Sequence, residues 1–244
     1  MQNLIILTYF FELLPFLLCC IFLQKIFTTK EGKAFFIYIL IYGIIILLVL
    51  FFRYYLDNRL ITALLKRLAI IVEFSLLCNY YRQILLNVKV KRFFSLAIPL
   101  FIILAFYDYY ISVERVISFI PLVIECLFFI ILIIYFFYEK IQYSLSTPIY
   151  LSMSFWISTG FLIYFSGNFF LFLYSKAAIK NEAFKIQYNL IYNFFTIVKD
   201  ILLCIGIVMN NQNHLNNDKL SIQSDLNQSL DFFTLSNKKK SPLT

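Results

Sequence analysis

Long apolar runs alternate with short polar segments along most of the chain. Each run approaches the roughly 20 residues that an α-helix needs to cross the hydrocarbon core of a bilayer. The pattern shows no series of short alternating strands of the kind that forms a membrane barrel. It therefore predicts an all-α polytopic membrane protein, a bundle of seven transmembrane helices at 4–23, 34–52, 60–81, 93–111, 117–137, 152–174 and 187–209.

The pattern changes after Met209. Residues 210–244 are rich in Asn, Gln, Ser and Asp with scattered leucines, a composition typical of a disordered segment. The chain is thus predicted to comprise a seven-helix transmembrane domain, 1–209, and a disordered cytoplasmic tail, 210–244. Leu226, Leu230, Phe232 and Phe233 recur at roughly helical spacing, so a short docking helix is the alternative to a solvated tail.

Composition agrees with a membrane protein. Hydrophobic residues make up 62% of the chain, aromatic residues 20% and charged residues 14%, with a mean hydropathy of +0.84, and a soluble domain of this length is less apolar. All five cysteines fall inside predicted helices without C-x-x-C spacing. We interpret them as apolar packing residues rather than as disulfide partners or metal ligands.

Lysine and arginine set the predicted orientation. They are more numerous in the first, third and fifth connections and the tail than on the opposite side, and such residues favour the cytoplasmic face. We expect a multi-pass protein of the cell inner membrane with its N-terminus outside and its C-terminus in the cytoplasm. The net charge of +8 then comes mostly from cytoplasmic loops and the tail, which lie next to anionic lipid. It does not indicate a nucleic-acid partner.

Ionisable residues interrupt four of the apolar runs near their middles. They are Glu12, Glu73, Glu125 and the adjacent pair Lys199 and Asp200. A charge at the centre of a membrane helix costs about 2.5–3.5 kcal/mol on insertion scales, so it usually has a partner or a function. Counted from the helix ends, the glutamates and Lys199 lie at similar depth, on the first, third, fifth and seventh helices.

The seventh helix has a polar side along its length. At about 100° per residue, Asn189, Asn193, Thr196 and Asp200 lie within about 60° of one another, and Lys199 widens the arc to about 120°. Such a side must face the bundle or a water-filled cavity. The sequence therefore predicts one polar core of Glu12, Glu73, Glu125, Asn189, Asn193, Thr196, Lys199 and Asp200.

Two interpretations of this core remain open. In the first, Lys199 pairs with Glu73 or Glu12, and a carboxylate without a partner is protonated because an isolated buried charge tends to neutralise. In the second, the charges form an ion-pair network that only orders the bundle. Either way, Thr8, Glu12, Pro15 and Cys19 share one face of the first helix, which should point inward.

Small residues are scarce in the predicted helices, and the sixth helix is the exception. Gly160 and Gly167 are seven residues apart with Tyr164 between them, and Trp156 lies one turn earlier on the same side. This stripe predicts a close packing face. Trp156 and Tyr164 are also candidate pocket aromatics, although aromatic residues on helix faces usually serve packing.

Several enzyme classes are excluded by the histidine count. The chain has one histidine, His214, in the polar tail, whereas zinc hydrolases, haem proteins and Ser-His catalysts need histidine ligands or a histidine base. No P-loop or H-E-x-x-H motif occurs. A retinal site is disfavoured because Phe195 stands where an acid would precede Lys199. We predict no enzyme, no catalytic residues, no cofactor and no metal.

Two motifs carry a family resemblance. Glu12-x-x-Pro15 near the start and Phe155-Trp156-x3-Gly160-x3-Tyr164-Phe165-Ser166-Gly167 in the sixth helix resemble uncharacterised seven-helix bacterial integral membrane proteins. The resemblance extends over the bundle and not the tail. It implies the seven-helix fold and brings no substrate, activity or catalytic residue with it.

Two functions fit these features. The first is a membrane sensor or accessory subunit whose polar core binds a small ligand or a proton and whose tail contacts a cytoplasmic or membrane signalling partner. The second is a small secondary transporter built from parallel three-helix repeats. That arrangement would match Glu12 with Glu125 and Glu73 with Lys199 at a midplane site.

Overall fold

The structure is a computed structural model that describes residues 2–55, 59–111, 120–143, 148–178, 184 and 186–209. Within these ranges the chain forms helices and no strand, which confirms the predicted all-α class. The predicted tail, 210–244, and His214 lie outside the described residues. The division into a bundle and a disordered tail therefore stays a prediction.

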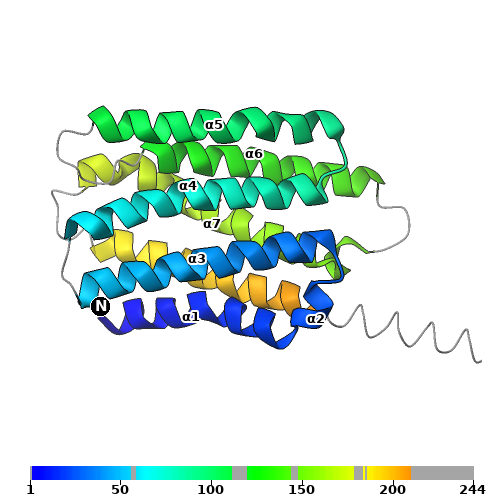
Figure 1. Cartoon of the computed structure of the whole chain (residues 1–244), viewed down its shortest axis with the longest axis horizontal. Coiled ribbons are helices and arrows are strands. Elements are labelled where there is room, and N and C mark those ends of the chain that lie inside the picture. Colours follow the sequence, from blue (N-terminus) through cyan, green and yellow to red (C-terminus); the bar gives the residue numbers. More distant parts are fainter. Residues whose placement is uncertain are drawn as a thin grey trace, which may run out of the picture.

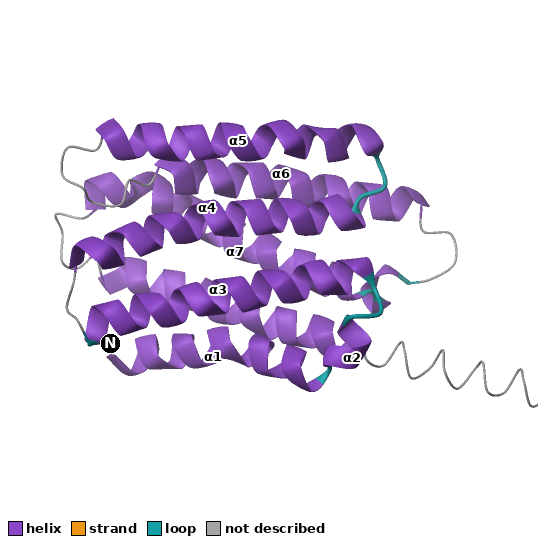
Figure 2. Ribbon diagram, in the orientation of Figure 1, coloured by secondary structure: helices purple, strands orange, loops and turns teal. Residues whose placement is uncertain are grey.

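The helices lie side by side and alternate in direction (Figures 1 and 2). In the described part of the chain seven of them have at least 20 residues: α1 (Gln2–Ile21), α3 (Lys30–Tyr54), α4 (Arg59–Ile84), α5 (Val88–Ile111), α6 (Ile120–Tyr143), α7 (Met153–Ala178) and an unlabelled helix at Ile186–Met209, named the 186–209 helix below. Two short elements, α2 (Leu23–Ile26) and η1 (Ile149–Leu151), lie between long helices.

Within the described ranges, five helices are long and apolar enough to cross a bilayer. Their spans are Lys30–Phe52, Val88–Asp108, Ile120–Gln142, Met153–Tyr174 and Ile186–Met209. The chain is accordingly a multi-pass helical membrane protein. In α1 the apolar part, Leu7–Ile21, is shorter, and α4 carries Lys66, Arg67 and Glu73 close together. For these reasons length and composition support five spans, and the predicted count of seven remains a proposal.

Neighbouring helices pack mostly in chain order. Among the labelled helices the most extensive contacts join α3 with α4 and α6 with α7, while α1 lies against α3, and α5 touches α4 and α6. Aromatic rings fill the interior: Phe74 of α4 stacks on Phe101 of α5 with ring centroids 3.9 Å apart. The opposite side of α5 exposes Leu96, Leu100 and Ile103, which suits a helix that faces lipid.

The turn between α2 and α3 depends on a glycine. Thr29 is the N-cap of α3, and its side-chain oxygen accepts a hydrogen bond of 3.0 Å from the backbone N–H of Gly32. A side-chain carbon at Gly32 would overlap the carbonyl oxygen of Ile26. Only glycine therefore lets α3 begin this close to α2.

Glycines also define the contact between α7 and the 186–209 helix. A side-chain carbon at Gly160 would lie 3.2 Å from the carbonyl oxygen of Lys199. The same addition at Gly167 would meet the ring of Phe195, and at Gly206 the carbonyl oxygen of Met153. The packing face predicted from Gly160 and Gly167 is confirmed, and its partner is the helix that carries Lys199.

Candidate functional site

The polar side of the 186–209 helix points into the bundle. Lys199 is 2% exposed and Asp200 3%, and Asn193 and Thr196 are also buried, whereas Asn189 is half-buried. On the other side of the same helix Phe194 and Ile201 are exposed. The helix thus presents its polar face to the interior and its apolar face outward, as a lipid environment requires.

The ion pair of Lys199 is formed with its neighbour in sequence. Its Nζ lies 3.3 Å from Oδ1 of Asp200, and both side chains are buried. Lys199 also interacts electrostatically with Glu73 of α4 and Glu12 of α1. The sequence favoured Glu73 or Glu12 as the direct partner. The structure instead pairs Lys199 with Asp200 and sets the two glutamates around the pair.

Two tyrosine rings enclose the Lys199 ammonium group. Its Nζ lies 4.9 Å from the ring centroid of Tyr164 on α7 and 5.7 Å from that of Tyr42 on α3. Both distances fall within the range of cation–π attraction. The hydroxyl of Tyr164 is hydrogen-bonded to Tyr192, so the cage is continuous with the polar side of the 186–209 helix.

Glu73 joins the cluster through α3. Tyr38 donates a hydrogen bond of 3.4 Å from its hydroxyl to Oε1 of Glu73, and the ring of Tyr38 stacks on Tyr42 at 5.6 Å. Both partners of this bond are buried. A carboxylate of α4, two tyrosines of α3 and the Lys199 ammonium group therefore meet in the interior.

Three other carboxylates have incomplete hydrogen bonding. Oε1 of Glu125, Oε2 of Glu12 and Oδ2 of Asp200 are buried without a hydrogen-bond partner among the described residues. Glu125 on α6 is 2% exposed, and its electrostatic neighbour is the carboxylate of Glu73. A buried oxygen without a partner is stabilised when it accepts a hydrogen bond from a donor or takes up a proton.

The face of α1 that carries Pro15 points into the bundle, as predicted. Thr8, Pro15 and Cys19 are buried and Glu12 is half-buried, so this face lies inward as its spacing predicts. The helix remains continuous through Pro15. Glu12 interacts electrostatically with Lys199, Asp200 and Glu73.

The two aromatic residues singled out on α7 have different surroundings. Trp156 donates a hydrogen bond of 2.7 Å from Nε1 to the carbonyl oxygen of Tyr150 in η1. It precedes Tyr164 by about two helical turns, so it lies toward the η1 end of the bundle. The structure thus brings Tyr164 next to Lys199 and gives Trp156 a role at the start of α7.

Three polar residues of the interior were missed in the sequence. Tyr38 and Tyr42 contact Glu73 and Lys199, and Asn168 on α7 is fully buried with both amide atoms unpartnered within the described ranges. The spacing of four between Tyr38 and Tyr42, and between Tyr164 and Asn168, was the available signal. The predicted second and sixth helices carry no charge near their middles, so no central charge distinguished these polar residues from packing residues.

Glu139, another buried carboxylate, lies near the end of α6 and has a structural role. Its two oxygens accept hydrogen bonds of 2.8 Å each from the backbone N–H groups of Leu86 and Asn87. The side-chain oxygen of Asn87 accepts a further bond of 2.9 Å from the N–H of Lys89. Glu139 therefore fastens the α4–α5 loop to α6, and its oxygens are satisfied.

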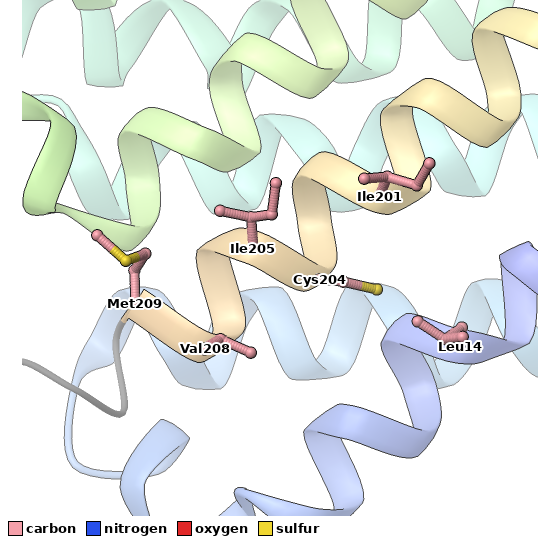
Figure 3. Close-up of a pocket in the computed structure, with 6 residues that line it drawn as sticks. All are labelled: Leu14, Ile201, Cys204, Ile205, Val208 and Met209. Atoms are coloured by element: carbon pink, nitrogen blue, oxygen red, sulfur yellow. The ribbon is translucent and has the colours of Figure 1, made fainter.

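An apolar pocket lies beside the polar cluster. Its volume is about 320 Å³, and it is lined by Leu14 of α1 and by Ile201, Cys204, Ile205, Val208 and Met209 of the 186–209 helix. Figure 3 shows the side chains of Leu14 and Cys204 on its two sides. None of the charged residues described above lines it, so the pocket offers hydrophobic contact and no polar recognition.

Neither a metal site among the described residues nor a similar known protein indicates a function for the polar core. The described residues contain no group of three or more His, Cys, Asp or Glu side chains that could hold a metal ion. No protein family, curated protein or solved structure matches the chain. The arrangement of Lys199, Asp200, Glu73, Glu12 and Glu125 can pair charges, bind hydrogen-bond donors or carry protons.

Proposed function

We propose that the protein is a membrane sensor or accessory subunit whose polar core binds a small ligand or a proton. The observation that carries this proposal is the combination of a buried Lys199–Asp200 pair with unpartnered carboxylate oxygens on Glu12 and Glu125. A network that only ordered the bundle would be expected to satisfy its own acceptors. The remaining acceptors favour a ligand that supplies donors.

The position of the ion pair suggests how a change caused by ligand binding would be transmitted to the end of the 186–209 helix. The backbone of Lys199 lies in the contact between α7 and the 186–209 helix, where a side-chain carbon at Gly160 would lie 3.2 Å from the carbonyl oxygen of Lys199. A change in the charge around Lys199 would alter this contact. We propose that the 186–209 helix carries the change to a cytoplasmic tail, 210–244, which contacts the partner.

In this proposal all seven long helices cross the inner membrane, the N-terminus lies outside, and the signal is passed without catalysis. The proposal is supported by the inward polar face of the 186–209 helix and by the electrostatic contacts that link it to α1 and α4.

Partner capture after crosslinking in native membranes tests the sensor proposal. We expect the full chain to capture a partner, a chain ending at Met209 to lose it, and Lys199→Met to change the amount captured. Gly43→Ala is the control, because a side-chain carbon at Gly43 meets nothing within 4 Å. Equal capture by all four proteins would contradict the proposal.

A secondary transporter is the second candidate. Glu12 and Glu125, which a repeat of three helices would make equivalent, both have a buried carboxylate oxygen without a partner in the described chain. The transporter hypothesis expects proteoliposomes to take up protons or substrate in a manner that Glu125→Gln abolishes and Glu139→Gln preserves. It also expects α1, α3 and α4 to superpose on α6, α7 and the 186–209 helix, and a poor superposition would remove it.

A further inference from the structure

Glu125 has less compensation than the other buried charges. Glu12, Glu73 and Asp200 all interact with the Lys199 ammonium group, whereas the electrostatic neighbour of Glu125 is the carboxylate of Glu73. Glu125 is 2% exposed, and its Oε1 has no hydrogen-bond partner in the part of the chain that the structure describes.

We propose that Glu125 holds a proton that it shares with Glu73, and that the proton is therefore the ligand of the polar core. This inference rests on the proposed role of the core as a ligand site and specifies its ligand. An ionised carboxylate without donors in an apolar interior is far less stable than the neutral acid, so it takes up a proton. Two carboxylates that interact electrostatically, as Glu125 and Glu73 do, cannot both ionise easily for the same reason.

The resting position of the proton follows from the neighbours of the two glutamates. Glu73 accepts a hydrogen bond from Tyr38 and interacts with Lys199, and both contacts stabilise a negative charge. Glu125 has neither contact among those described. The proton accordingly resides on Glu125 while Glu73 is ionised.

Transfer moves one proton and one negative charge between helices. The O–H bond on Glu125 breaks as an O–H bond forms on an oxygen of Glu73, and the negative charge passes from α4 to α6. Lys199 and Asp200 then lose their nearby Glu73 charge, which changes the electrostatics at the contact with α7. Glu12, which also interacts with Lys199 and Glu73, extends this set of interacting charges to α1.

The proton suits the site better than a metal ion. No cluster capable of holding a metal occurs among the described residues, and a proton needs no cavity. The other titratable groups within electrostatic range of the charged residues are the hydroxyls of Tyr38, Tyr42, Tyr164 and Tyr192 and the thiols of Cys78, Cys126 and Cys204.

Infrared spectroscopy of the full chain in phosphatidylcholine nanodiscs at neutral pH tests the assignment. A protonated carboxyl group has a C=O stretching band that is separate from carboxylate bands and shifts in D₂O. We expect Glu125→Gln to lose one component of this band, Glu73→Gln to shift the same component, and exchange of NaCl for KCl to leave it unchanged. Size-exclusion chromatography and circular dichroism verify that each variant is folded.

Glu139→Gln is the matched control, because Glu139 is equally buried but both its oxygens accept backbone hydrogen bonds. It should keep the component that Glu125→Gln loses. A folded wild-type protein without a protonated carboxyl band overturns the inference, as does a folded Glu125→Gln variant with the wild-type band. Partner capture by the full chain and its truncation is measured separately, so failure of the sensor proposal is distinguishable from failure of the proton assignment.

Discussion

Lys199 shows how a single charge is accommodated in the interior of this bundle. Its ammonium group has an ion pair with Asp200 at 3.3 Å and two tyrosine rings with centroids 4.9 and 5.7 Å away. Desolvation of such a group is offset only when each partner is close and well oriented. Removing the ammonium group would leave Asp200 and Glu73 as negative charges without their cation.

We predict that Lys199→Met destabilises the protein by about 3–5 kcal/mol, the range observed when one member of a buried pair is removed. The measurement is the free energy of unfolding in bicelles. Adding Asp200→Asn to Lys199→Met should restore part of the loss, because it removes the unpaired carboxylate. A double variant that is less stable than Lys199→Met would contradict the role given to the pair.

Lys140 provides the control. It lies in the last turn of α6, where its Nζ is 5.7 Å from the ring centroid of Phe136, and it interacts electrostatically with Glu31. Because Lys140 is only half-buried, Lys140→Met should cost at most about 1 kcal/mol.

At the residue scale the sequence predicted which side chains of the seventh helix point inward and not which atoms meet. Asn193, Thr196 and Asp200 could be placed on one face because the helical rotation per residue is fixed. The partner of Lys199 could not be predicted, because it depends on side-chain rotamers and on the rotation of each helix about its axis. Tyr42 and Asn168 could not be assigned to the core, because they lie on predicted helices without a central charge that would mark an inward polar face.

The contact between α7 and the 186–209 helix is the element whose geometry depends most directly on small residues. Gly160 lies against the backbone of Lys199, and Gly206 lies against that of Met153. Helices in a bilayer associate through close van der Waals packing because lipid already solvates their apolar side chains. A large side chain at Gly160 would separate the two helices.

We predict that Gly160→Leu destabilises the protein by about 1–3 kcal/mol through overpacking. The added side chain has to displace Leu202 or the backbone of Lys199, each 3.2 Å from its first carbon. The melting temperature in detergent measures the effect. Gly43→Leu is the control, since its first carbon meets nothing within 4 Å, and equal losses in both variants would contradict this account.

Helix existence was predictable from the sequence, and helix ends less so. The predicted segment 93–111 is found as Val88–Ile111, and 117–137 is found as Ile120–Tyr143. Apolar runs mark the part of a helix that lipid solvates. The helix itself continues into residues such as Lys89 and Lys140, because its backbone hydrogen bonds are satisfied whether or not its side chains are apolar.

At the scale of the whole molecule, the seven long helices imply a definite distribution of loops between the two sides of the membrane. Apolarity alone supports five crossings, so the behaviour of α4 decides the topology. If α4 crosses the bilayer, Tyr55 before it and Lys89 after it lie on opposite sides. Both residues are exposed.

We predict that Tyr55→Cys is labelled by a membrane-impermeant maleimide from outside the cell and Lys89→Cys only from the cytoplasmic side. The parent protein is the control, because its cysteines all lie in helices. Labelling of both variants from the same side would show that α4 does not span the membrane.

The all-α class could be predicted because lipid offers no hydrogen bonds to the backbone, which leaves helices or closed barrels as solutions. The arrangement of the helices could not. Residues such as Leu96 and Phe94 on α5 are equally apolar, yet the first is exposed and the second buried. Hydrophobicity distinguishes core from surface in water and does not do so in a bilayer.

The anchor at Glu139 has a consequence for the order of assembly during synthesis. Glu139 follows Leu86 and Asn87 in the chain by 53 and 52 residues, so both amides are synthesised before their acceptor. α5 can therefore reach its final position only after α6 has emerged. If synthesis pauses between these helices, water at the membrane surface has to hydrogen-bond the two N–H groups in place of Glu139.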